Sequence, residues 1–133
     1  MDRLFLDANV LFSAAYRERT GLLRLWELSD TQVFTSRYAA AEARRNLPTQ
    51  EQQKRLDSIL ERTELTDEGD PRTIDDEKLL PKKDRPILRA AVLGKATHLI
   101  TGDLAHFGRF FGKRLQGVMV MPPADYLASR ENI

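Results

Sequence analysis

The feature that most constrains the fold is a repeated alternation between short apolar segments and longer helical ones. Five segments are short and mostly β-branched or apolar, as buried strands are: 3–6, 32–35, 63–65, 98–101 and 117–121. Helix-forming segments separate most of them. Because parallel strands need crossovers of this kind, we predict an α/β fold, a three-layer α/β/α domain with a central, mainly parallel sheet of about five strands. The polar stretch 66–78 is its one long loop.

Capping residues predict where several helices begin and end. Thr49 and Gln52 have the spacing of a capping box for a helix over 51–62. Gly94 is expected to end the helix that begins near Asp84. Further helices are predicted after Thr20 (21–28), after Ser36, and after Pro122 and Pro123 (124–130).

Length and composition limit the class of protein. A chain of 133 residues is long enough for one core, so we expect a single domain over 1–133. The chain has no cysteine, which excludes thiolate metal ligands and is compatible with a reducing cytoplasm. No apolar run reaches the roughly 18 residues of a membrane span, so we expect a cytoplasmic protein without a membrane partner. The formal charge of +1 gives no global sign of nucleic-acid binding.

Four acidic residues lie at positions that such a fold could bring together. Asp7 and Asp103 each follow a predicted buried strand, at the end where open parallel sheets bind their ligands. Glu42 lies in an Ala-rich helix, and Asp84 lies at the start of another. If they meet, they offer the oxygen ligands that a hard divalent cation prefers. Each also has an ordinary explanation: a helix cap, an exposed helical acid, or a charge at a helix N-terminus.

For three other polar residues, we expect roles that do not include binding the metal. Asn9 is expected to cap the next helix and to hold a carboxylate by a hydrogen bond, without touching the ion. His106 is expected to have a packing or surface role, because Mg²⁺ prefers oxygen. His98 is expected to be structural, since the chain lacks a third histidine for a zinc centre.

Basic and aromatic side chains near the acids suggest contacts with nucleic acid. Arg37, Arg45, Lys83 and Arg85 are positioned to bind phosphates around an acidic pocket, without reading the base sequence. Three aromatic residues follow the last acid: Phe107, Phe110 and Phe111. They could stack on bases, pack in the core or form a dimer surface, and the sequence leaves all three roles open.

The order of four short motifs resembles the PIN-domain nuclease family. The motifs are LFLDANVL (4–11), SRYAAAE (36–42), KDRPILRAA (83–91) and LITGD (99–103). The resemblance implies a PIN-like fold in which one or two Mg²⁺ or Mn²⁺ ions are held by Asp7, Glu42, Asp84 and Asp103. It also implies that Thr101 orients a carboxylate or the attacking water.

The same resemblance extends to toxin-type (VapC-like) ribonucleases of toxin–antitoxin systems. It implies an endoribonuclease that hydrolyses RNA through a metal-activated water, forms a homodimer, and is held inactive by an antitoxin protein. Ala105 departs from the family, since many members carry an acidic or amide residue there, and this leaves the number of metal ions open. The alternative is a non-catalytic PIN-like module that binds RNA or a protein.

Overall fold

A six-stranded sheet lies at the centre of the computed structural model, which describes residues 1–70 and 79–131. The strand order is β3-β2-β1-β4-β6-β5, and every neighbouring pair is parallel except β5 and β6. The strands are β1 (Asp2–Leu6), β2 (Thr31–Ser36), β3 (Glu64–Thr66), β4 (His98–Ile100), β5 (Arg114–Leu115) and β6 (Val118–Met121). The predicted five strands are confirmed. The sixth, β5, has only two residues, which is too short to produce an alternating pattern.

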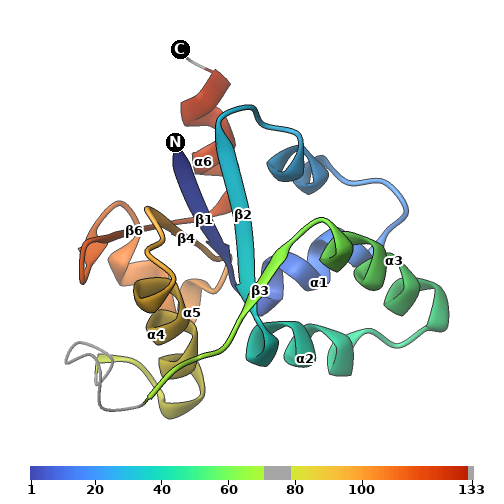
Figure 1. Cartoon of the computed structure of the whole chain (residues 1–133), viewed down its shortest axis with the longest axis horizontal. Helices are drawn as coiled ribbons and strands as arrows, with labels where there is room; N and C mark the ends of the chain where they lie inside the picture. The colour runs from blue at the N-terminus through green and yellow to red at the C-terminus, as the bar shows by residue number, and fades with distance from the viewer. Residues whose placement is uncertain (71–78, 132–133) are drawn as a thin grey trace.

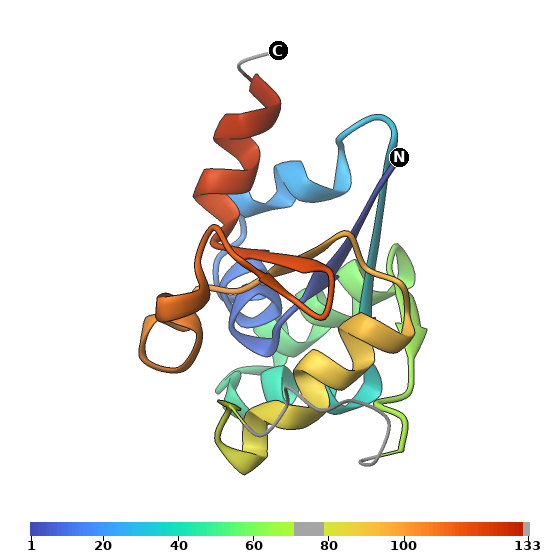
Figure 2. The same cartoon turned by 90° about the vertical axis from the view of Figure 1, so that its left-hand side faces the viewer.

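Helices flank this sheet on both sides, so the predicted three-layer architecture is confirmed (Figures 1 and 2). They are α1 (Ala8–Tyr16), α2 (Arg37–Asn46), α3 (Gln50–Glu61), α4 (Arg85–Leu93), α5 (Leu104–Phe107) and α6 (Pro123–Glu131), with the 3₁₀ helices η1 (Gly21–Trp26), η3 (Lys82–Asp84) and η4 (Gly108–Phe110). In Figure 1, α4 lies to the left of β1, while α1, α2 and α3 lie to its right. No helix in the described part of the chain is long and apolar enough to cross a membrane.

The predicted caps are present at several helix ends. Ser36 Oγ accepts a hydrogen bond from the Ala39 amide (3.1 Å) at the start of α2, and Thr49 and Gln52 form the expected capping box of α3. The segment after Thr20 differs from the prediction, because it forms a short 3₁₀ helix, η1, instead of an α-helix over 21–28. Of the predicted long loop, residues 71–78 lie outside the described part of the chain.

Gly94 ends α4 as predicted, although its backbone angle does not require glycine. Its φ is −80°, whereas the next residue, Lys95, takes the left-handed conformation with a φ of 60°. A Cβ atom on Gly94 would lie 2.3 Å from Cε2 of Phe34. Glycine is therefore needed here because the helix end packs directly on the Phe34 ring at the centre of the core.

The order of the strands places two carboxyl ends beside each other at the middle of the sheet. β1 lies between β2 and β4, and its last residue, Leu6, pairs with Ile100 at the end of β4. The chain leaves β1 towards β2 and β3 on one side, and continues from β4 towards β6 on the other. A crevice forms where the connections diverge in this way, and it is the usual ligand-binding position of an open parallel sheet.

Candidate active site

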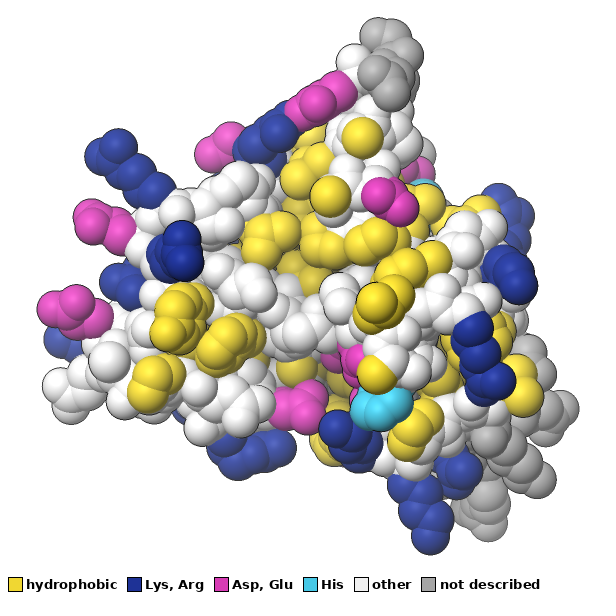
Figure 3. All heavy atoms as spheres, turned by 180° about the vertical axis from the view of Figure 1, so that it is seen from behind, with side chains coloured by type: hydrophobic (Ala, Val, Ile, Leu, Met, Phe, Trp, Pro, Cys, Tyr) yellow, Lys and Arg dark blue, Asp and Glu magenta, His cyan; other side chains and the backbone are white. Residues whose placement is uncertain are grey.

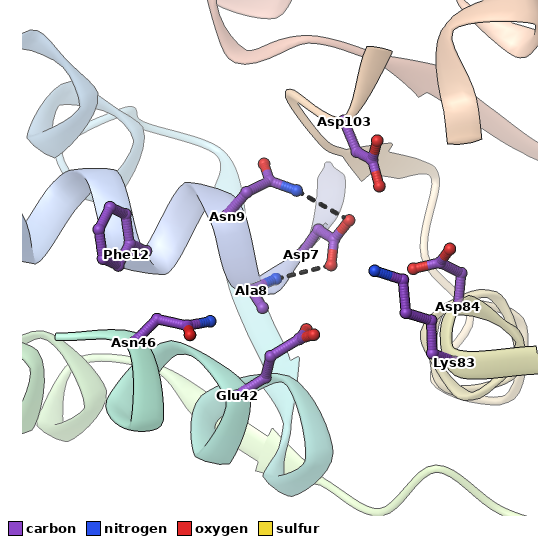
Figure 4. A pocket seen from close by; sticks show the side chains of 9 residues that line it. All are labelled: Asp7, Ala8, Asn9, Phe12, Glu42, Asn46, Lys83, Asp84 and Asp103. Atoms are coloured by element: carbon purple, nitrogen blue, oxygen red, sulfur yellow. Dashed lines mark hydrogen bonds between the residues drawn. The ribbon is translucent and has the colours of Figure 1, made fainter. Parts of the chain in front are cut away.

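A cleft of about 460 Å³ lies at these carboxyl ends. Figure 4 shows the side chains that line it, which come from four separate parts of the chain: Asp7, Ala8, Asn9, Phe12, Glu42, Asn46, Lys83, Asp84 and Asp103. All four predicted acids are among them. On this face of the molecule, acidic side chains lie next to a histidine and a basic side chain near the middle of the surface (Figure 3).

Asp7 is the most deeply buried of the four acids, with 3% of its surface exposed. It occupies the N-cap position of α1, and its Oδ1 accepts a hydrogen bond from the Ala8 amide (2.7 Å). Burial raises the pKa of Asp7 to about 6, even though hydrogen bonds from Thr101 and Ala8 lower it, and the charges of Asp84 and Glu42 raise it further. The fold therefore holds this carboxylate where its negative charge is unfavourable.

Thr101 and Asn9 fix the other oxygen of Asp7. Thr101 Oγ1 donates a hydrogen bond to Asp7 Oδ2 (2.8 Å), and Asn9 Nδ2 donates to the same oxygen (3.1 Å). Asn9 Oδ1 also accepts from the Gly102 amide (2.7 Å), which ties α1 to the segment after β4. Asn9 thus contacts the carboxylate as expected, but it does not cap α1, because Asp7 occupies that position.

Asp84 lies at the junction of η3 and α4 and is 8% exposed. Its buried Oδ2 accepts no hydrogen bond from any described residue. Burial raises the pKa of Asp84; the negative charges of Asp103 and Glu42 also raise it, whereas His106 and Lys83 lower it. A buried acceptor atom without a hydrogen bond is unusual in folded proteins. The nearest cationic group to this atom is the His106 ring, whose Nδ1 lies 2.8 Å away.

Asp103 begins α5 and holds His106 beside it. Asp103 Oδ1 accepts from the His106 amide (3.1 Å), and Oδ2 lies 2.9 Å from His106 Nδ1. The same ring nitrogen lies 2.8 Å from Asp84 Oδ2. This placement differs from the packing or surface role expected for His106. The signal available in the sequence was its spacing, three residues after Asp103, which one helical turn places on the same side.

Glu42 reaches the cleft from α2. Its carboxylate points towards Asp7 (Figure 4), and Asn46, one turn further along the helix, lines the cleft next to it. Burial raises the pKa of the nearby Tyr38 hydroxyl, and the charge of Glu42 raises it further. Glu42 is therefore electrostatically part of the acidic group.

Of the four basic residues predicted to bind substrate, only Lys83 lines the cleft, where its amine points towards the acids (Figure 4). Arg37 forms an ion pair with Asp67 (2.9 Å) on the exposed surface. Arg85 Nε donates to the carbonyl of Leu80 (3.0 Å), so part of its guanidinium serves to hold the segment before η3. Arg45 is exposed, and its charge lowers the pKa of Tyr38.

The aromatic residue that lines the cleft is Phe12, which the sequence did not single out. It lies one helical turn after Ala8 on α1, so the spacing from Asp7 was the available signal. Phe107, by contrast, is fully buried in the core, which excludes base stacking by this residue. Phe110 packs partly against the core and under the guanidinium of Arg109, which lies 4.6 Å from the ring centre.

The comparisons with known proteins agree with this architecture. Among solved structures, the chain is similar to one in the crystal structure of VapBC2 from Rickettsia felis bound to a DNA fragment from their promoter. The TM-score is 0.69 at 18% sequence identity, over 90% of this chain and 98% of that chain, a likeness that shows the fold. No curated protein matches. The family model of the PIN domain matches residues 3–105, which is most of the sequence, and the chain therefore belongs to the PIN domain family.

Proposed function

We propose that this protein is an endoribonuclease that hydrolyses RNA phosphodiester bonds and depends on Mg²⁺ or Mn²⁺. The observation that carries the proposal is the convergence of four carboxylates, from four separate elements, on one cleft. Carboxylates held this close repel one another, and burial adds to the cost by raising the pKa values of Asp7 and Asp84. A divalent cation compensates both effects.

The donor atoms fit such an ion. Asp7, Glu42, Asp84 and Asp103 would hold it, and all of them offer the oxygen ligands that Mg²⁺ and Mn²⁺ accept. The buried Oδ2 of Asp84, which accepts no hydrogen bond from a described residue, has a lone pair available for this purpose. A bound divalent ion supplies an activated water for attack on phosphorus and neutralises charge on the phosphate oxygens.

The surrounding residues would keep the site in shape and hold the substrate. Thr101 and Asn9 fix the orientation of the Asp7 carboxylate by their hydrogen bonds to Oδ2. Lys83, which lines the cleft, would contact a phosphate there, and the exposed Arg45, whose charge lowers the pKa of Tyr38, would offer a second cation. Arg37 and Arg85 would contribute only if they release the partners that they have in this structure.

The direct test is cleavage of labelled RNA by purified protein with Mg²⁺ or Mn²⁺, with and without a chelator, beside the Asp7→Asn variant. We expect cleavage that requires the metal and is lost in the variant. Equal cleavage by variant and parent would point to a contaminating nuclease. RNA or peptide binding that ignores the metal, with no cleavage of any RNA, would favour the non-catalytic module instead.

We also propose that the protein is the toxin of a toxin–antitoxin pair, acts in the cytoplasm as a homodimer, and has an antitoxin protein as its partner. The support is its PIN domain and its structural likeness to the VapBC2 chain. Expression of the chain alone in bacteria should arrest growth, and the Asp7→Asn variant should not. Co-expression with the product of an adjacent small gene should restore growth, and light scattering of the purified chain should give the mass of a dimer.

A further inference from the structure

We infer that His106 is a nitrogen ligand of the cation site, and that it gives the site a preference for Mn²⁺ over Mg²⁺. The inference rests on the proposed function in one respect, because both concern a cation in the same cleft. It goes beyond that function because it adds a nitrogen ligand, His106, to the four carboxylates. This ligand would make the site prefer Mn²⁺ to Mg²⁺.

The position of one nitrogen atom carries the inference. Nδ1 of His106 lies 2.8 Å from Asp84 Oδ2 and 2.9 Å from Asp103 Oδ2, so three potential ligand atoms from two separate segments converge. Ligands at neighbouring positions of an octahedral ion, with bonds of about 2.1 Å, lie about 3 Å apart. The separations around Nδ1 are therefore those of ligands that share one ion.

Hydrogen bonding alone does not account for this arrangement. Nδ1 of an imidazole either carries one proton or has one lone pair, so it can form one good hydrogen bond in the ring plane. That bond is directed at Asp103 Oδ2. Asp84 Oδ2 is equally close and yet accepts no hydrogen bond, although it is buried. A cation among the three atoms gives each of them a partner, whereas a proton can serve only one carboxylate well.

The local structure prepares His106 for this role. The Asp103 side chain caps α5 by accepting from the His106 amide (3.1 Å), which fixes the first turn of the helix and so the direction of the ring. The side chain is 30% exposed, so the ring borders on solvent. A metal ion can therefore reach Nδ1 without opening the core.

The nitrogen predicts the choice of metal. Mg²⁺ is hard and dehydrates reluctantly, so it favours oxygen ligands, and an imidazole in its site replaces a better ligand. Imidazole suits the later first-row metals best, and Mn²⁺, the weakest binder of that series, suits the carboxylates that the other four ligands supply. Mn²⁺ is nevertheless softer than Mg²⁺ and gives up its water more easily, so an imidazole is a less unfavourable ligand for Mn²⁺ than for Mg²⁺. The site should therefore bind Mn²⁺ more tightly than an all-carboxylate PIN site would.

The sharpest test uses Mn²⁺ alone as the probe. Pulsed electron paramagnetic resonance of the Mn²⁺-loaded protein detects a nitrogen nucleus bound directly to the ion. The chain has only two histidines, and the other, His98, lies at the start of β4 with its ring edge-on to Tyr126. We expect nitrogen coupling in the parent and in His98→Asn, and none in His106→Ala or His106→Asn. Mn²⁺ bound without nitrogen coupling in the parent would overturn the inference.

A calorimetric titration of the same four proteins gives the second readout. We expect the parent to bind Mn²⁺ about tenfold or more tightly than Mg²⁺, and His106→Ala to lose about tenfold in Mn²⁺ affinity with little change for Mg²⁺. His98→Asn should behave like the parent. Equal losses for both metals in His106→Ala would show that His106 only positions Asp103, and would overturn its role in selecting the metal.

Failure here is distinguishable from failure of the proposed function, because neither readout involves RNA. A protein that binds Mn²⁺ through oxygen alone and still cleaves RNA would disprove the histidine ligand and leave the nuclease intact. A protein that shows nitrogen coupling but cleaves no RNA would keep this inference and disprove the activity. Absence of any Mn²⁺ binding would overturn both.

Discussion

Acidic side chains near the two ends of the sheet differ in the partners that they have. Towards the amino ends of the strands, Glu64 forms an ion pair with Arg3 (2.6 Å), and Asp2 accepts a hydrogen bond from the Tyr126 hydroxyl (2.6 Å). At the carboxyl ends, neither Asp7 nor Glu42 forms an ion pair with a described residue. Asp84 and Asp103 share one partner, the His106 ring. Acidic side chains thus have partners of their own at the amino ends, whereas in the cleft two carboxylates share one imidazole and two have no ion pair with a described residue.

This difference indicates where the molecule gives up stability for function. A buried carboxylate that lacks a cation costs free energy of folding, and such groups collect at sites that bind or react. The hydroxyl and amide groups around Asp7 hold the carboxylate in place without neutralising it. A bound cation would neutralise it.

The largest expected effect distinguishes two glutamates. Glu42→Gln removes a proposed metal ligand while keeping the shape of the side chain, and RNA cleavage should fall by at least about 100-fold, as expected when several kcal/mol of transition-state stabilisation is lost. Glu64→Gln affects only the ion pair with Arg3, so cleavage should stay within about twofold and stability should fall by at most about 1 kcal/mol. Equal RNA cleavage by the two variants would contradict the proposal that Glu42 has a role in cleavage that Glu64 lacks.

The second prediction concerns the pH dependence of the metal-free protein. Asp7 has a folded pKa of about 6, raised from 3.8, so the folded state binds more protons between these values and the free energy of unfolding falls as pH rises through this window. The difference corresponds to about 3 kcal/mol for this buried group. Asp7→Asn should therefore be more stable than the parent by up to about 3 kcal/mol near pH 7, with no advantage near pH 4.

Urea unfolding with a chelator, repeated across this pH range, measures the effect. The control is Asp2→Asn at the other end of the sheet, which should gain no stability at any pH, because its carboxylate already has Tyr126 and Arg130 as partners. Adding Mn²⁺ at about 100 times its dissociation constant should stabilise the parent by about 2.7 kcal/mol and Asp7→Asn by much less. A stability difference between Asp7→Asn and the parent that does not grow between pH 4 and pH 6 would contradict the burial argument for Asp7.

The third prediction compares the threonines on either side of β4. Thr101 Oγ1 donates to Asp7 Oδ2 and accepts from the Asp103 amide (3.1 Å), so Thr101→Val should reduce cleavage by about 10- to 100-fold, as loss of a group that orients a ligand does. Thr97 Oγ1 bonds to the Arg3 backbone instead. Thr97→Val should lower stability by about 1 kcal/mol and leave cleavage unchanged. Cleavage rates measured under single-turnover conditions decide between a site role and a structural one.

The smallest expected effect lies at the amino ends of the strands. The Arg3 guanidinium stacks over the Phe34 ring at 4.0 Å, donates to the Gly94 carbonyl (2.6 Å) and pairs with Glu64. Lysine cannot make these planar contacts together, so Arg3→Lys should cost about 1 kcal/mol of stability and leave metal binding unchanged. Thermal unfolding with and without Mn²⁺ measures both quantities. A change in Mn²⁺ affinity would mean that the two ends are coupled through β1.

The sequence predicted most of the fold because the evidence for each element is local. The strand at 3–6 and the capping box at Thr49 and Gln52 can each be recognised within one short segment. β5 could not be predicted, since two residues carry no period and its pairing depends on β6. The helix expected after Thr20 became a 3₁₀ helix. This segment packs against α1, α6 and β2, and such contacts with distant elements cannot be read from its own residues.

The sequence by itself determined where the four carboxylates fall along the chain, because strand and helix periods place Asp7, Asp84 and Asp103 at element ends and Glu42 within a helix. Only the tertiary structure decided that His106 joins Asp84 and Asp103, that Phe107 enters the core, and that Arg37 and Arg85 have partners elsewhere. The physical reason is that the direction of a side chain and its contacts depend on how elements distant in sequence pack together. No single segment of the chain encodes that packing.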